Sequence, residues 1–195
     1  MMVKLLILAK GSEIMLVLIG KSASGKTTIA QELVKKHGFH SIVRYTTRPI
    51  RDDETQDVAY HFITTDEFIE KVNNGFFIEW KDYVTNEGLW YYGTALEDVK
   101  NADKDSVIIL TPQGIRDLKN LGIENMTVLY IYSNNFTIEH RLEKRGDKCE
   151  EICRRMSTDA LDFKNAELLA DKIVYNNYSD KFENVIHNVL WRYGR

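Results

Sequence analysis

The stretch that decides the fold is residues 15–27, which read MLVLIGKSASGKT. The first five residues are all apolar and end at Gly20, which is typical of a strand buried in a parallel sheet. Residues 20–27 fit the spacing G-x-x-x-x-G-K-[ST], and apolar residues at helical spacing follow over 26–37. A strand, a glycine-rich turn and a helix in this order predict a phosphate-binding loop, because main-chain amides and the positive helix end then face one anion.

Several residues of this loop are candidates for contact with a nucleotide. We expect Lys26 to bridge the β- and γ-phosphates and the Thr27 hydroxyl to be a Mg²⁺ ligand. The other expected contacts are Gly20, Ser22, Ala23, Ser24, Gly25 and Thr28. The alternative is a chance turn rich in glycine and serine, which the flanking strand and helix disfavour. The loop by itself predicts a nucleotide but not a reaction.

Strand and helix patterns alternate along most of the chain. This alternation predicts an α/β fold of the P-loop NTPase type, with helices on both faces of a parallel sheet. The expected strands are 15–19, 39–43, 107–110, 128–132 and 172–175, and the expected helices are 26–37, 115–121, 135–145, 150–169 and 180–191.

Residues 46–94 interrupt the alternation and predict a small inserted subdomain with a mixed sheet. Within and beside it we expect a loop over 44–57, a helix over 66–72 capped by Thr64 or Thr65, and a hairpin of 76–84 and 89–92 around the turn 86–88. We therefore predict one domain over 1–195, with a core of about 15–45, 95–135 and 165–195 and a helical lid of about 136–160.

Composition limits the class of protein. The 195 residues are 44 % hydrophobic and 28 % charged, and the net charge of −3 provides no general basic field for nucleic acid. The two cysteines, Cys149 and Cys153, have no ligand partners at metal-site spacing and predict reduced thiols in a cytoplasmic protein. Residues 1–14 are either an extra strand or a segment ahead of a natural start at Met15, which we favour.

Further motifs follow the phosphate loop in a fixed order. They are TTRPIR (46–51), YHF (60–62), FIEW (77–80), YYGT (91–94), RLEKRG (141–146) and RR (154–155). Together they resemble the guanylate kinase family from about residue 15 to 177. The resemblance implies the reaction ATP + GMP ⇌ ADP + GDP with Mg²⁺, and dGMP as a further acceptor. It also implies small nucleotides as partners, neither nucleic acid nor membrane, and a monomer or homodimer.

The acceptor phosphate has a candidate site in these motifs. Arg48 and Arg51 can grip a dianionic phosphate with fork geometry, and Tyr60 and Tyr92 can each donate a hydroxyl hydrogen bond. The resemblance implies the same roles at the matching positions. The alternative for the arginines is a solvated loop charge, which we disfavour, whereas the tyrosines read singly are more often core or hairpin aromatics.

The acceptor base has a candidate reader in Glu79. Its carboxylate could accept from guanine N1–H and the N2 amine, and adenine would leave it unpaired. The resemblance implies this role, with Thr94 also contacting the base; a solvent-facing strand residue is the alternative. The remaining expected substrate contacts are Arg44, Gly93 and Thr111.

The resemblance also implies a set of lid arginines. Arg141, Arg145 and Arg155 would close on the ATP phosphates and stabilise the charge of the transferred group. Read singly, each of these arginines is more readily explained as part of a charged helix face. Asn176 matches a family position near the adenine of ATP.

The sequence departs from the family pattern at several positions. Arg44 replaces a serine that helps to hold guanine, so it either donates to guanine O6 or alters the pocket. Ile109 and Thr111 replace acids. In the loop that follows Arg51, the family has glycines where this chain has Asp53 and Asp57, and an aspartate where it has Ala59. The lid is also about two residues shorter than in the family.

Two other functions are consistent with these departures. One is a P-loop kinase for a different nucleoside monophosphate or a modified guanine nucleotide. The other is a guanylate-kinase-like binding protein with weak or no catalysis, although such proteins usually lose the loop lysine, which is retained here as Lys26.

Overall fold

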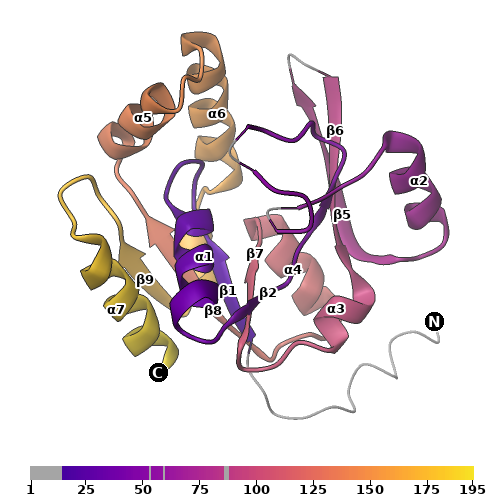
Figure 1. The fold of residues 1–195 in the computed structure, drawn as a ribbon, viewed down its shortest axis with the longest axis horizontal. Coiled ribbons are helices and arrows are strands. Elements are labelled where there is room, and N and C mark those ends of the chain that lie inside the picture. The colour runs from indigo at the N-terminus through magenta and orange to yellow at the C-terminus, as the bar shows by residue number, and fades with distance from the viewer. Residues whose placement is uncertain (1–14, 53, 59, 86–87) are drawn as a thin grey trace. The chain divides into compact units, whose positions relative to one another are not determined.

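The computed structural model describes residues 15–52, 54–58, 60–85 and 88–195 (Figure 1). These residues form two compact units. The first comprises residues 15–41, Lys104–Arg116 and Asn125–Arg195, and the second comprises Ile42–Asp103 and Asp117–Glu124. The hypotheses about 1–14, about Asp53 and Ala59, and about the tip of the turn at 86–87 lie outside the described residues.

The first unit contains the predicted parallel sheet. Its strand order is β2-β7-β1-β8-β9, and all its neighbouring strands run parallel. The five strands are β1 (Met15–Ile19), β2 (His40–Ser41), β7 (Ser106–Ile109), β8 (Met126–Tyr132) and β9 (Lys172–Tyr175). The apolar run at 15–19 becomes the central strand and is wholly buried, as its composition predicts.

Helices α1 (Lys26–Lys36) and α7 (Phe182–Tyr193) pack on one face of this sheet. The core between them contains Leu16 and Leu18 of β1, Ile29 and Leu33 of α1, and Val189 of α7. Helices α5 (Asn135–Lys144) and α6 (Cys149–Asp162), which lie in the segment predicted to be a lid, form a smaller cluster that packs against the phosphate loop at Ala23. Cys149 and Cys153 are free and exposed.

The prediction of one helix over 150–169 is wrong. Helix α6 ends at Asp162, and a short 3₁₀ helix, Ala166–Leu169, follows. Asn165 between them has a left-handed φ of 59°, a conformation that asparagine tolerates and that stops an α-helix. The helical periodicity of the sequence continues across this break because both pieces bury apolar residues.

The second unit contains a mixed sheet with strand order β4-β3-β6-β5. Its strands are β3 (Tyr45–Thr46), β4 (His61–Phe62), β5 (Phe77–Thr85) and β6 (Gly88–Ala95), and its helices are α2 (Thr65–Asn73) and α3 (Leu96–Lys100). The prediction that 44–57 is entirely loop is wrong for 45–46, because Tyr45 and Thr46 pair with Gly93 and Tyr92 of β6. Thr64 caps α2 through a capping box with Glu67.

Aromatic side chains form the core of this mixed unit. Phe68 of α2 is fully buried and stacks on Phe77 at 4.5 Å and on Tyr91 at 5.3 Å between ring centroids. A Cβ atom at Gly93 would lie 2.8 Å from the Phe77 ring, so the sheet needs glycine at this position. Figure 1 shows α2 beside the long β5–β6 pair.

Among the described helices, none combines the length and the apolar character that crossing a bilayer requires. Helix α4 (Pro112–Asn120) begins after β7. The Thr111 hydroxyl accepts the Gly114 amide at 3.1 Å, which is N-cap geometry. Thr111, an expected substrate contact, thus has a structural hydrogen bond at the start of this helix.

Candidate functional site

The phosphate loop curls at the end of β1 in the predicted conformation. Gly20 has φ +156°, and a Cβ atom there would lie 2.4 Å from the Ile131 carbonyl oxygen of β8. Gly25 has φ +96°, and a Cβ atom there would lie 2.3 Å from Nδ2 of Asn176. Both glycines of the motif are therefore required by close packing as well as by backbone conformation.

Lys26 folds back over this loop. Its Nζ donates to the carbonyl oxygens of Gly20 and Lys21 at 2.7 and 2.8 Å. Burial lowers the pKa of Lys26 to about 8, and the nearby Asp159 carboxylate partly opposes this shift. The ammonium is therefore charged at neutral pH, and an anion beside it would stabilise that charge further.

Asp159 of α6 contacts the loop directly. Its Oδ2 accepts the Ser22 amide at 2.6 Å, and this amide is one of those expected to face a phosphate. A carboxylate at a cluster of main-chain amides makes the same kind of charge-assisted hydrogen bond that a phosphate oxygen makes. The sequence offered no signal for Asp159, since an aspartate within a charged helix has no distinguishing neighbour.

The phosphate loop is held by side chains that contact its main-chain carbonyl groups, those of Asn176, Ser133 and Arg141. Asn176 donates through Nδ2 to the Ser24 carbonyl at 2.8 Å, and it accepts from Arg141 at 3.3 Å through Oδ1. Arg141 also donates to the Ala23 carbonyl at 3.1 Å, and the Ser133 hydroxyl donates to the Asn176 carbonyl at 2.5 Å. Arg141 is therefore placed at the phosphate loop.

Ser133 was not predicted, although its place directly after a parallel strand, where ligands gather, was an available signal. Thr27 and Thr28 are exposed in the first turn of α1.

The other two predicted lid arginines, Arg145 and Arg155, pair with acidic residues of the same segment, 136–160. Arg145 donates to Asp147 at 2.9 Å, and Arg155 lies 2.7 Å from Glu151.

The second unit gathers the residues predicted for the acceptor phosphate. Arg48 is only 4 % exposed, and its Nη2 contacts both carboxylate oxygens of Glu54 at 2.7 and 2.8 Å. Its guanidinium lies 5.7 Å from the Tyr60 ring centroid, and the Tyr60 and Tyr92 rings are 5.8 Å apart. This burial excludes the reading of Arg48 as a solvated loop charge.

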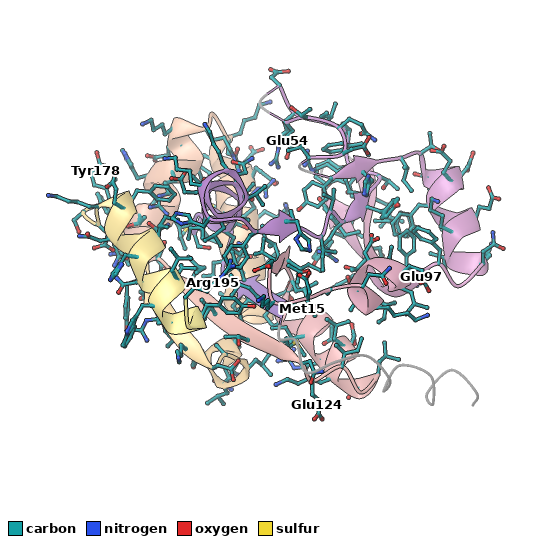
Figure 2. The ribbon with its side chains drawn as sticks, turned by 60° about the horizontal axis from the view of Figure 1, so that its bottom comes forward. Met15, Glu54, Glu97, Glu124, Tyr178 and Arg195 are labelled. Carbon is teal, nitrogen blue, oxygen red and sulfur yellow. The ribbon has the colours of Figure 1, made fainter. Side chains whose placement is uncertain are left out.

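Glu54, labelled in Figure 2, organises the loop around Arg48. Its Oε2 also accepts the Arg51 amide at 3.0 Å, and the Arg51 guanidinium lies 3.8 Å from its Oε1. Glu54 was not predicted from the sequence, although its spacing of three residues from Arg51 was an available signal. The two arginines thus share one carboxylate, which holds them close enough to act on one anion.

The residues predicted for the base also lie together. Glu79 of β5 pairs with Thr94 of β6 in the sheet register, and Arg44 stands just before β3. The Arg44 Nη2 donates to Glu79 Oε1 at 2.7 Å, and the Arg44 Nε donates to the Thr94 hydroxyl at 3.0 Å. Glu79 is 6 % exposed, so it is not a solvent-facing strand residue. Its charge is compensated within the cluster.

The described residues contain no group of three or more histidine, cysteine, aspartate or glutamate side chains that could hold a metal ion. The sequence-based expectation is a metal held by nucleotide phosphates together with Thr27, which lies in the first turn of α1. Mg²⁺ accepts such an arrangement, because it commonly binds through one or two protein oxygens together with substrate phosphates.

Comparisons with known proteins agree on one family. A sequence model of guanylate kinase matches residues 12–193. The guanylate kinase of Nitratidesulfovibrio vulgaris is 34 % identical over 160 residues, 80 % of this chain and 75 % of that protein. The guanylate kinase of Neisseria gonorrhoeae is 29 % identical over 173 residues, 87 % of this chain and 82 % of that protein. A crystal structure of guanylate kinase from Anaplasma phagocytophilum shares the fold, with a TM-score of 0.69 at 22 % identity over 92 % of this chain and 84 % of that chain.

Proposed function

This chain belongs to the guanylate kinase family, and from that premise we propose that it transfers the γ-phosphoryl group of ATP to GMP, forming ADP and GDP. The observation that carries the proposal is the intact phosphate loop, in which Lys26 is held over the loop by two main-chain carbonyls. A guanylate-kinase-like protein that only binds its partner does not need that lysine, whereas phosphoryl transfer uses it to compensate the negative charge on the β- and γ-phosphates.

The ATP half of the reaction uses the first unit. The amides of residues 20–27 bind the phosphates, and Lys26 bridges the β- and γ-phosphates. Arg141, held beside the loop at Ala23, adds positive charge where the transferred group acquires negative charge. Arg145 and Arg155 exchange their lid partners for phosphate oxygens when the lid closes, which also excludes water as a competing acceptor.

The GMP half uses the second unit. Arg48 and Arg51 bind the acceptor phosphate, and Tyr60 and Tyr92 donate hydroxyl hydrogen bonds to it. Because Glu54 already orients Arg48, little side-chain entropy is lost when the phosphate binds. Glu79, Thr94 and Arg44 contact the base. Binding fixes the acceptor oxygen for attack, so the chain's contribution is positioning and electrostatic stabilisation.

Mg²⁺, with Thr27 as its protein ligand, would neutralise phosphate charge during the transfer. We propose that the protein acts in the cytoplasm as a monomer or homodimer, with nucleotides rather than nucleic acid or membrane as its partners. The net charge of −3 supports the exclusion of nucleic acid.

An ADP-release assay with ATP, Mg²⁺ and each of GMP, AMP, CMP and UMP tests the proposal. We expect turnover with GMP and a loss of at least about 100-fold in kcat for Lys26→Ala, on the scale of losing a group that stabilises transition-state charge. Lys35→Ala, an exposed lysine on the same helix, is the matched control and should retain wild-type turnover. A folded wild-type protein that turns over no GMP refutes the function, and an active Lys26→Ala refutes the role of the lysine.

A further inference from the structure

The second unit contains a cluster of three polar side chains that are almost fully buried, namely Arg44, Glu79 and Thr94. The side chains of Arg44 and Glu79 are 10 % and 3 % exposed. Arg44 donates to Glu79 Oε1 and to the Thr94 hydroxyl, and the Thr94 hydroxyl in turn donates to the same Oε1. Both contacts to the carboxylate therefore fall on one of its two oxygens.

The hydrogen-bonding capacity of the cluster is limited by this arrangement. A carboxylate oxygen accepts about two hydrogen bonds, so Glu79 Oε1 is fully used by Arg44 and Thr94. The groups with remaining capacity are Glu79 Oε2, which is an acceptor, and guanidinium N–H groups of Arg44, which are donors. The cluster thus offers a base one acceptor beside donors.

This combination matches one part of a 6-oxopurine. The O6 atom accepts from the guanidinium, and the adjacent N1–H donates to the remaining carboxylate oxygen. Guanine carries a further donor, the 2-amino group, whose natural partner would be the second carboxylate oxygen. Because Oε1 is occupied, the 2-amino group gains no full hydrogen bond from Glu79.

We propose that the acceptor site reads the O6 and N1–H groups of 6-oxopurine nucleoside monophosphates without reading the 2-amino group, so that the protein phosphorylates IMP alongside GMP. This inference rests on the proposed kinase function and specifies its substrate class. AMP is rejected, because its N1 acceptor would face the carboxylate and its N6 amine would face the guanidinium. Both contacts would leave buried polar groups mispaired.

The test measures kcat/KM for GMP, IMP and AMP with the full chain, ATP and Mg²⁺. We expect wild-type values for GMP and IMP within about tenfold of each other, and AMP far below both. Arg44→Ser removes the guanidinium and releases one lone pair of Oε1, so guanine can then donate to both carboxylate oxygens. The GMP-to-IMP ratio should rise at least about tenfold in this variant, on the scale of one added hydrogen bond to a charged group. Arg116→Ser, the same change at an exposed position of α4, should leave the ratio unaltered.

The outcomes separate the two proposals. Turnover of GMP with IMP disfavoured by more than about tenfold overturns the inference and leaves the kinase function standing. A GMP-to-IMP ratio that Arg44→Ser does not change also overturns it, because a purely structural Arg44 would lower both activities together. No turnover of either nucleotide by the folded protein refutes the kinase function itself. The wild-type ratio decides the inference even if Arg44→Ser fails to fold.

Discussion

We expect Asp159 to compete with ATP for the phosphate loop, so that its removal should tighten ATP binding. The Asp159 carboxylate accepts the Ser22 amide at 2.6 Å and lies close enough to Lys26 to influence its pKa. An ATP phosphate that takes over this amide must first displace the carboxylate. The substitution Asp159→Ala removes that competitor and one negative charge from the loop.

The magnitude follows from the contact that is lost. A hydrogen bond to a charged group contributes about 1.5–3 kcal/mol, and Asp159 is partly exposed, so the lower end of the range applies. About 1.4 kcal/mol corresponds to a tenfold change in Kd. We therefore expect ATP to bind Asp159→Ala roughly tenfold more tightly than wild type, and Asp159→Asn, which keeps an acceptor without the charge, to lie between them.

Isothermal titration calorimetry with ATP and Mg²⁺ at pH 7 measures this effect. Glu150→Ala makes the same charge change at an exposed position in the first turn of α6 and serves as the control for general electrostatics. It should bind ATP like wild type. The reasoning is refuted if Asp159→Ala binds ATP no more tightly than wild type, or if Glu150→Ala gives the same gain.

Three further predictions concern other contacts. The pKa of Lys26 is about 8, and its charged form binds phosphate. The Kd for ATP should therefore rise above pH 8 by up to about tenfold per pH unit. A Kd that stays constant from pH 7 to 9.5 would contradict this. Gly25→Ala should weaken ATP binding at least about tenfold and lower Tm in a thermal scan, because the new Cβ atom would lie 2.3 Å from Asn176 Nδ2. An affinity for ATP equal to that of wild type would show that the loop rearranges to accommodate the Cβ atom. Glu54→Gln should lower Tm by roughly 4–8 °C, because it leaves the buried Arg48 without its partner carboxylate at a cost of about 2 kcal/mol. Added GMP should then raise its Tm less than it raises that of wild type, because Arg48 is no longer held in position for the phosphate, and an equal shift would argue against phosphate binding at Arg48.

The sequence predicted the parts of the fold that local patterns control. The apolar run at 15–19 and the glycines after it have few alternative conformations, so β1 and the phosphate loop appear where expected. The pair Tyr45–Thr46 was missed because two residues carry no periodicity, and their pairing with β6 is a tertiary property. The end of α6 was missed because Asn165 adopts a left-handed conformation that many sequences with asparagine do not.

In the candidate site, too, the features carried by short motifs could be predicted from the sequence, and those that depend on tertiary packing could not. The residues expected at the acceptor site could be named because their motifs are short and ordered, and the structure brings them together. The acids that contact the expected site residues could not be named in this way. Glu54 stands close to Arg48 in the chain, whereas Asp159 is 137 positions from Ser22. Which acid neutralises which base depends on how distant segments pack, and the charges alone allow many pairings. The pairing of Arg44 with Glu79 likewise needed the mixed sheet that places them together.

The support of the phosphate loop by Asn176 has a consequence for biosynthesis. Ser24 and its hydrogen-bond donor Asn176 are 152 positions apart in the chain, so this contact cannot form until all the residues between them have been synthesised. ATP can stabilise only a conformation to which it binds. ATP can therefore stabilise the supported form of the loop only after the segment that carries Asn176 has been made and β9 is in place.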